Sequence, residues 1–136
     1  MSGSVWYLDT SATAKLVRPE AETAHLRRWL RPRAWLTSDL QRTELRRAAA
    51  RAGGRAPARA DRLLTEIDLI AVTPEVFDAA GRLTLASLRS LDAIHLAAAL
   101  TLGPDLAGIV AYDDRLAGNA EALGITVKTP GRPRTR

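Results

Sequence analysis

Residues 5–11 read VWYLDTS, so four apolar, β-prone residues run directly into a carboxylate and two hydroxyl residues. An apolar run of this length is typical of a strand buried on both faces of a parallel sheet. In such sheets, ligands bind beyond the carboxyl ends of the strands, where the strand order reverses. The sequence therefore places Asp9 at a candidate site. The alternative is that Asp9, Thr10 or Ser11 only caps the following helix, and Ser11 is the preferred cap.

Length and composition indicate a single globular domain. The chain has 136 residues, enough for one sizeable core, with 46% hydrophobic and 26% charged residues. The lack of cysteine excludes disulfides and thiolate metal sites and suggests a reducing compartment. No apolar run approaches the roughly 20 residues that span a bilayer, and the N-terminus lacks the pattern of a secretory signal. We therefore expect a cytoplasmic protein without a membrane segment.

The formal net charge is +5, and every basic residue except Lys15 and Lys128 is arginine. Arginine binds phosphate through two parallel hydrogen bonds, so a polyanionic partner such as nucleic acid fits this composition. The alternative is that the arginine and alanine content reflects genomic base composition. Charge alone does not decide between these interpretations, and it says nothing about the fold.

Strand and helix patterns alternate along the chain. Strands are predicted at residues 5–8, 34–37, 69–72, 108–112 and 125–127. Helices are predicted at residues 12–17, 20–31, 39–52 (capped by Ser38 or Asp39), 57–66, 74–81, 90–100 and 115–123. This alternation predicts an α/β fold with a parallel sheet covered by helices on both faces. We expect one domain over residues 1–128 and a basic, disordered tail over residues 129–136.

Two predicted helices carry an isolated acid. Glu44 lies among arginines, so its alternative role is a surface ion pair with Arg47. Asp92 lies near the start of the helix at 90–100, which is apolar nearly all round, and an acid is rarely buried there unless it is paired or ligating. His95 shares a face with Asp92. Because no second histidine completes a helical zinc pair, we interpret His95 as bonding Asp92 or a backbone carbonyl.

Asp113 follows the predicted strand at 108–112 and repeats the arrangement seen at Asp9. In a parallel sheet, acids after strands and in the adjoining helices can converge on one edge, where a cation must offset their repulsion. Oxygen ligands without cysteine indicate Mg²⁺ or Mn²⁺, which activates water and stabilises charge on a phosphodiester. The sequence therefore predicts a metal-dependent nuclease whose site is formed by Asp9, Glu44, Asp92 and Asp113.

Four motifs occur in order along the chain: LDTSA at 8–12 with KL at 15–16, SDL at 38–40 with ELRR at 44–47, LDAIHLA at 91–97, and YDDRL at 112–116. Each motif alone is weakly specific. Their order and spacing together resemble the PIN domain and, more narrowly, the VapC toxins of bacterial toxin–antitoxin pairs. The resemblance extends over residues 5–127, which is nearly the whole chain.

The resemblance implies a PIN-like three-layer α/β/α sandwich with a mostly parallel sheet of four to five strands. It implies Mg²⁺-dependent cleavage of RNA, with Mn²⁺ as a substitute, and Asp9 and Asp92 as direct metal ligands in the acidic cluster. One position departs from the family: Ala111 stands two residues before the last acid, where the family commonly has Thr or Ser. Whether Asp114 shares the role of Asp113 stays open. We prefer Asp113 because it directly follows the strand.

The resemblance also implies partners: an RNA substrate, a cognate VapB-like antitoxin that inserts groups into the active groove, and a second copy in a homodimer. Trp29 and Trp35 are candidates for interface anchors or for core packing. The alternative function is a catalytically silent PIN fold that serves as an RNA- or protein-binding module. The presence of all four acids favours the enzyme.

Overall fold

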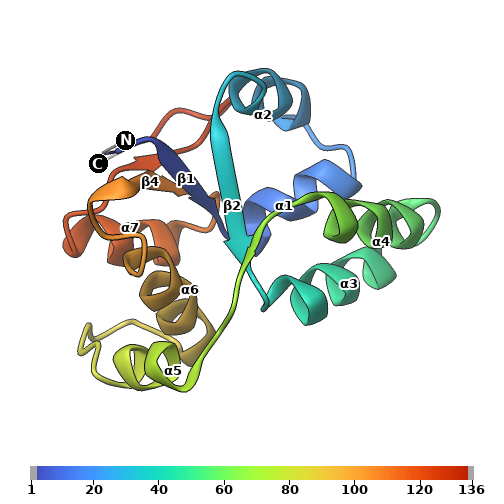
Figure 1. The fold of residues 1–136 in the computed structure, drawn as a ribbon. Helices are drawn as coiled ribbons and strands as arrows, with labels where there is room; N and C mark the ends of the chain where they lie inside the picture. The colour runs from blue at the N-terminus through green and yellow to red at the C-terminus, as the bar shows by residue number, and fades with distance from the viewer. Residues whose placement is uncertain (1–2, 135–136) are drawn as a thin grey trace.

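The sheet at the centre of the molecule has five strands, all parallel, in the order β3-β2-β1-β4-β5 (Figure 1). The structure is a computed structural model that describes residues 3–134. The strands are β1 (Val5–Leu8), β2 (Ala34–Ser38), β3 (Leu69–Ile70), β4 (Leu106–Val110) and β5 (Val127–Lys128). The chain passes from β1 to β2 and β3, then crosses back to β4 and β5 on the other side. The strand order therefore reverses between β1 and β4, where ligand sites of such sheets lie.

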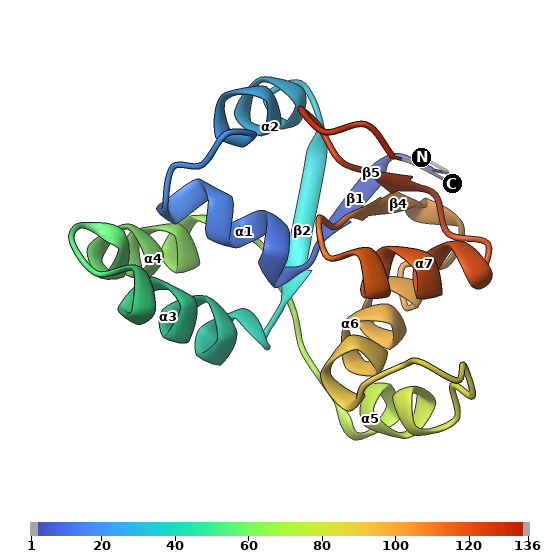
Figure 2. The same ribbon diagram turned by 180° about the vertical axis from the view of Figure 1, so that it is seen from behind.

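Helices cover both faces of the sheet, which confirms the predicted three-layer arrangement (Figures 1 and 2). One face carries α1 (Thr10–Val17), α2 (Thr23–Leu30), α3 (Gln41–Ala52) and α4 (Ala56–Glu66). The other face carries α5 (Pro74–Gly81), α6 (Ser90–Leu100) and α7 (Asp114–Ala122), and a 3₁₀ turn (Gly103–Asp105) precedes β4. None of the helices in the described part of the chain is long and apolar enough to cross a bilayer.

Successive residues of the central strands enter opposite halves of the core. Tyr7 and Leu8 of β1 are both fully buried, yet Tyr7 packs with α5, α6 and α7 while Leu8 packs with α1 and α2. Ile109 and Val110 of β4 divide in the same way. A strand buried on both faces needs apolar residues at consecutive positions, which explains the unbroken run before Asp9.

Trp29 and Trp35 are partly buried and pack against the same core as Leu8. The ring of Trp29 meets that of Trp6 edge to face, with 4.8 Å between the ring centroids. Edge-to-face packing is a favourable arrangement for two aromatic rings in a core. Core packing is therefore the role that both tryptophans have within one copy of the chain.

The strands at the two edges of the sheet differ from the prediction. The strand expected at 69–72 pairs with β2 only over two residues of β3, and the strand expected at 125–127 is displaced to β5. Each edge strand has one neighbour, so its length depends on how far the backbones run side by side. Side-chain pattern does not report that distance.

Helix α3 begins at Gln41, and neither of its two expected caps accepts a side-chain hydrogen bond from the backbone of the helix. Ser38 is the last residue of β2, and its hydroxyl accepts a hydrogen bond from Tyr7 (2.9 Å). Asp39 forms an ion pair with Arg42 (3.3 Å). The Ser38 side chain is therefore engaged by β1, and the Asp39 side chain by a side chain of α3 rather than by its backbone.

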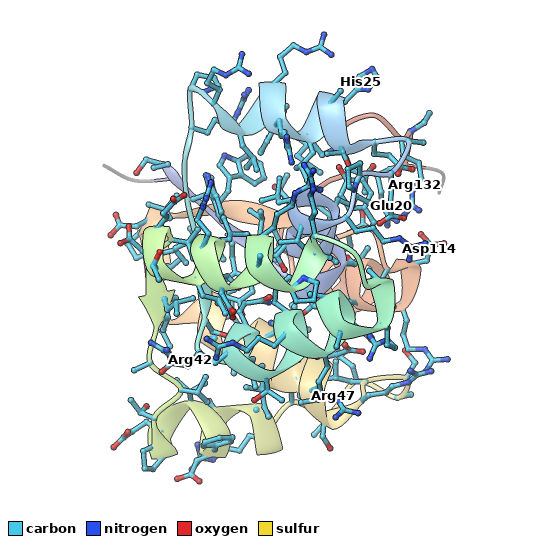
Figure 3. All side chains as sticks on the ribbon, turned by 90° about the vertical axis from the view of Figure 1, so that its right-hand side faces the viewer. Glu20, His25, Arg42, Arg47, Asp114 and Arg132 are labelled. Atoms are coloured by element: carbon cyan, nitrogen blue, oxygen red, sulfur yellow. The ribbon has the colours of Figure 1, made fainter. Side chains whose placement is uncertain are left out.

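The described part of the basic tail, residues 129–134, has contacts with the body of the domain. A nitrogen of Arg132 donates to the backbone oxygen of Tyr112, and its guanidinium lies 5.4 Å from the centre of the Tyr112 ring. Figure 3 shows Arg132 beside Asp114, and the two form an ion pair at 3.5 Å. Gly, Pro and Arg composition suggests disorder, but here an aromatic ring and an acid give the arginine partners. Residues 135–136 lie outside the described residues.

Candidate active site

Asp9 directly follows β1 and caps helix α1 itself. Its Oδ1 accepts hydrogen bonds from the backbone N of Ala12 (3.2 Å) and from Oγ of Ser11 (2.6 Å), so the expectation that Ser11 is the cap was wrong. The Asp9 side chain is buried, and burial raises its pKa to about 6. His95 and the Ser11 hydrogen bond oppose this rise in pKa, while the charge of Asp113 adds to it.

Ser11 joins the ends of the two central strands. Its hydroxyl donates to Asp9 and accepts from the backbone N of Tyr112 (2.7 Å) and of Asp113 (3.3 Å). Ala111, where a hydroxyl residue is common in the family, is fully buried in the core that faces α6 and α7. The hydroxyl at the end of β4 therefore comes from Ser11.

Asp113 and Asp114 have different surroundings. Asp113 caps helix α7, and its Oδ1 accepts from the backbone N of Leu116 (3.0 Å). The charge of Asp113 raises the pKa of Asp9, which places it within electrostatic range of that residue. Asp114 has a side chain that is 86% exposed and pairs with two arginines of the tail, one of them Arg132. Asp113 is thus the acid at the strand end, and Asp114 is engaged by the tail.

Glu44 lies in the first turn of α3, and its contacts differ from the ion pair with Arg47 that local spacing suggests. Its Oε1 accepts from Oγ1 of Thr10 (2.8 Å) and lies 2.6 Å from Nε2 of His95. Burial alone would raise the pKa of Glu44, but the hydrogen bond and charge of His95 hold it below its ordinary value. Glu44 therefore stays ionised although its side chain is only 22% exposed.

His95 was misassigned from the sequence, because its partners are neither Asp92 nor a backbone carbonyl. Besides its contact with Glu44, its Nδ1 lies 2.7 Å from the hydroxyl of Tyr7. Helix α6 is apolar nearly all round, and this pattern was the sequence signal that His95 has partners outside its own helix. A polar residue in such a helix must find its partners across the core.

Asp92 lies in the first turn of α6 and is half-buried. Burial raises its pKa, and the charges of Asp113 and Glu44 add to the rise, while His95 and Arg89 oppose it. Asp92 forms no hydrogen bond or ion pair with any side chain in the described part of the protein. Its carboxylate is therefore held near other acids without a protein donor to compensate its charge.

The four predicted acids come from four places in the chain and act on one another electrostatically at one edge of the sheet. Asp9, Glu44 and Asp113 share a further feature: within residues 3–134, the carboxylate of each accepts protein hydrogen bonds through only one of its two oxygens. As the side chains stand, no three or more His, Asp or Glu residues in that range are close enough to hold a metal ion. Like charges repel, and oxygen donors of this kind suit a hard divalent cation.

Fold and site together define a class: α/β proteins with a parallel sheet, helices on both faces and carboxylates at the carboxyl ends of the central strands. The model of the PIN domain family matches residues 6–121. "Ribonuclease VapC46" of Mycobacterium tuberculosis (strain ATCC 25618 / H37Rv) is 45% identical over 125 residues, covering 91% of this chain and 96% of the relative. "Ribonuclease VapC47" of M. tuberculosis (strain CDC 1551 / Oshkosh) is 41% identical over 136 residues, covering 94% and 98%. The chain therefore belongs to the PIN domain family and, within it, to the VapC group.

Proposed function

We propose that this protein is a metal-dependent endoribonuclease that hydrolyses RNA phosphodiester bonds. The observation that carries the proposal is the group of four acids at one sheet edge, where Asp113 raises the pKa of Asp9 and of Asp92. Acids raise one another's pKa because their negative charges repel, and a bound cation can offset this repulsion. The printed names of the relatives, which are ribonucleases, support RNA as the substrate.

The donor set fits Mg²⁺, with Mn²⁺ as a substitute. The ligands would be Asp9, Glu44, Asp92 and Asp113. In three of them one carboxylate oxygen accepts hydrogen bonds from the described part of the protein, and in Asp92 neither does. When bound, the cation would activate water and stabilise charge on the phosphodiester. The chain itself orients the carboxylates: Ser11 and the backbone of α1 hold Asp9, and His95 and Thr10 hold Glu44.

The helix that carries Glu44 also presents arginines to solvent. Arg42 and Arg47 of α3 are both exposed (Figure 3), and Arg47 forms no ion pair with any residue that the structure describes. Arginine side chains of this kind bind the RNA backbone and position it without reading its sequence. We infer that α3 contributes an acid to the site and exposed arginines that contact the phosphates of the RNA.

We further propose that the protein is the toxin of a toxin–antitoxin pair, with a VapB-like antitoxin and a homodimer as its assemblies. Family membership is the main support. Three large apolar side chains on α5 and α6 are also exposed, and each is a candidate contact with another protein. They are Phe77, Leu91 and Leu100.

Cleavage of RNA by purified protein, freed of any antitoxin, tests the proposal against the silent binding module. Wild type with Mg²⁺ should cleave, and EDTA or Asp9→Asn should abolish cleavage. Asp61→Asn is the matched control, because Asp61 is exposed and, among the described residues, its side chain pairs with Arg46 alone (3.2 Å). Equal cleavage by wild type and Asp9→Asn contradicts the proposal. RNA binding without cleavage by wild type supports the binding module instead.

A further inference from the structure

His95 lies in the core between α6, β1 and α3, with 3% of its surface exposed. Its Nε2 is 2.6 Å from Oε1 of Glu44, and its Nδ1 is 2.7 Å from the hydroxyl of Tyr7. The Tyr7 hydroxyl is in turn 2.9 Å from Oγ of Ser38 at the end of β2. The imidazole is therefore held at both nitrogens by side chains from different elements of the fold.

The proton positions in this chain of hydrogen bonds set the direction of the bond to Glu44. An ionised carboxylate only accepts, so Nε2 carries a proton wherever Glu44 is ionised. Burial raises the pKa of the Tyr7 hydroxyl, so this hydroxyl stays protonated. It donates one hydrogen bond, either to Oγ of Ser38 or to Nδ1 of His95. In both arrangements His95 donates to Glu44 through Nε2.

Both hydrogen bonds that the carboxylate of Glu44 accepts from described residues end on Oε1, one from Thr10 (2.8 Å) and one from His95. With two donors on one oxygen, the carboxylate loses a bond if it turns. We propose that His95 is a positioning residue, which fixes Glu44 through Oε1 and so leaves Oε2 to a divalent cation. This inference rests on the proposed function, because it takes Glu44 as part of the metal site.

A purely structural role for His95 would use the same contacts to hold α6 on the sheet. The two roles differ in how the hydrogen bond responds when a cation binds. A cation at Oε2 draws negative charge away from Oε1 and weakens the hydrogen bond from Nε2. In the purely structural role, Glu44 lies outside the metal site, and the bond does not respond to the metal.

Nuclear magnetic resonance of ¹⁵N-histidine in the wild-type protein tests this difference without any substitution. The chain has two histidines, and His25 on α2 is exposed and serves as the internal control. During a Mg²⁺ titration, the Nε2 resonance of His95 should move with the midpoint that calorimetry gives for Mg²⁺ binding, while His25 stays in place. Calorimetric binding of Mg²⁺ without movement of His95 overturns the inference. Absence of Mg²⁺ binding overturns the metal site of the proposed function, and this inference with it.

Binding of Mn²⁺, measured from the electron paramagnetic resonance of the free ion, supplies a second test with variants. His95→Gln keeps a donor, His95→Leu removes it, and Leu96→Ala alters a fully buried neighbour on the same helix. We expect His95→Leu to weaken Mn²⁺ binding about 10-fold or more and His95→Gln about threefold or less, while Leu96→Ala binds as wild type does. Equal weakening by His95→Leu and Leu96→Ala, or no weakening by His95→Leu, contradicts positioning. If His95→Leu does not fold, the resonance of wild-type His95 still decides.

Discussion

The hydroxyl of Ser11 lies 2.6 Å from Oδ1 of Asp9 and donates to it. The same hydroxyl accepts from the backbone of Tyr112 and Asp113, so one side chain connects the acid after β1 to the turn after β4. The strand order reverses between these two strands. Ser11 thus adds a side-chain connection to the backbone pairing of β1 with β4, which together set the positions of Asp9 and Asp113.

Ser11→Ala should lower both stability and cleavage. The change leaves the backbone N of Tyr112 without its side-chain acceptor, which we expect to cost about 1–3 kcal/mol in the free energy of unfolding. It also removes a hydrogen bond that lowers the pKa of Asp9. Urea unfolding measures the first effect. Thr65→Ala, which removes an exposed hydrogen bond to the backbone oxygen of Arg62 (2.6 Å), is the control and should cost less than about 0.5 kcal/mol.

Asp9→Asn should stabilise the metal-free protein at neutral pH. The folded-state pKa of Asp9 is about 6 against 3.8 for the free group, so the folded protein binds this proton more tightly than the unfolded chain. The stability that Asp9 contributes is therefore fully present below pH 3.8 and is lost as the pH rises to about 6. Asparagine carries no charge and can accept the same hydrogen bonds.

In EDTA at pH 7.5, we expect Asp9→Asn to gain at most about 3 kcal/mol in the free energy of unfolding, and the gain should disappear near pH 4. Denaturant unfolding at several pH values measures it. Asp61→Asn should change stability little at any of them, because its ion pair is exposed. A less stable Asp9→Asn protein at pH 7.5 would show that burial does not strain this carboxylate.

Gly108→Ala should disrupt the centre of the sheet. A Cβ at this position of β4 would lie 2.5 Å from the backbone oxygen of Thr126 and 2.6 Å from Cζ3 of Trp6. Overpacking of this kind costs about 1–3 kcal/mol or more. Gly118→Ala is the matched control, because nothing lies within 4 Å of its Cβ and it sits in helix α7. Thermal unfolding should show a lower midpoint for the first variant and a slightly higher one for the second.

Arg132→Ala should loosen the tail from the domain. The variant loses the hydrogen bond to Tyr112, the contact with its ring and the ion pair with Asp114. We expect a loss of about 1 kcal/mol and faster proteolysis after residue 128. Arg47→Ala, on the exposed side of α3, should change neither stability nor proteolysis. Proteolysis of Arg132→Ala at the wild-type rate would show that these contacts do not hold the tail.

The fold and the positions of Asp9 and Asp113 at strand ends could be predicted because both depend on local pattern. The apolar run before Asp9 and its repeat before Asp113 indicate buried parallel strands, and strand ends determine where such acids lie. The bond between His95 and Glu44 joins residues 51 positions apart, so spacing along one helix pointed to the wrong partner. The contact of Arg132 with Tyr112 was missed for the same reason.

The position of Mn²⁺ in crystals of the metal-loaded protein, located by its anomalous scattering, most directly tests whether these acids form a metal site. The account predicts Mn²⁺ in contact with an oxygen of Asp9 and with at least one of Asp92 and Asp113. Mn²⁺ bound elsewhere, or no bound Mn²⁺ at a concentration that supports RNA cleavage, would contradict it.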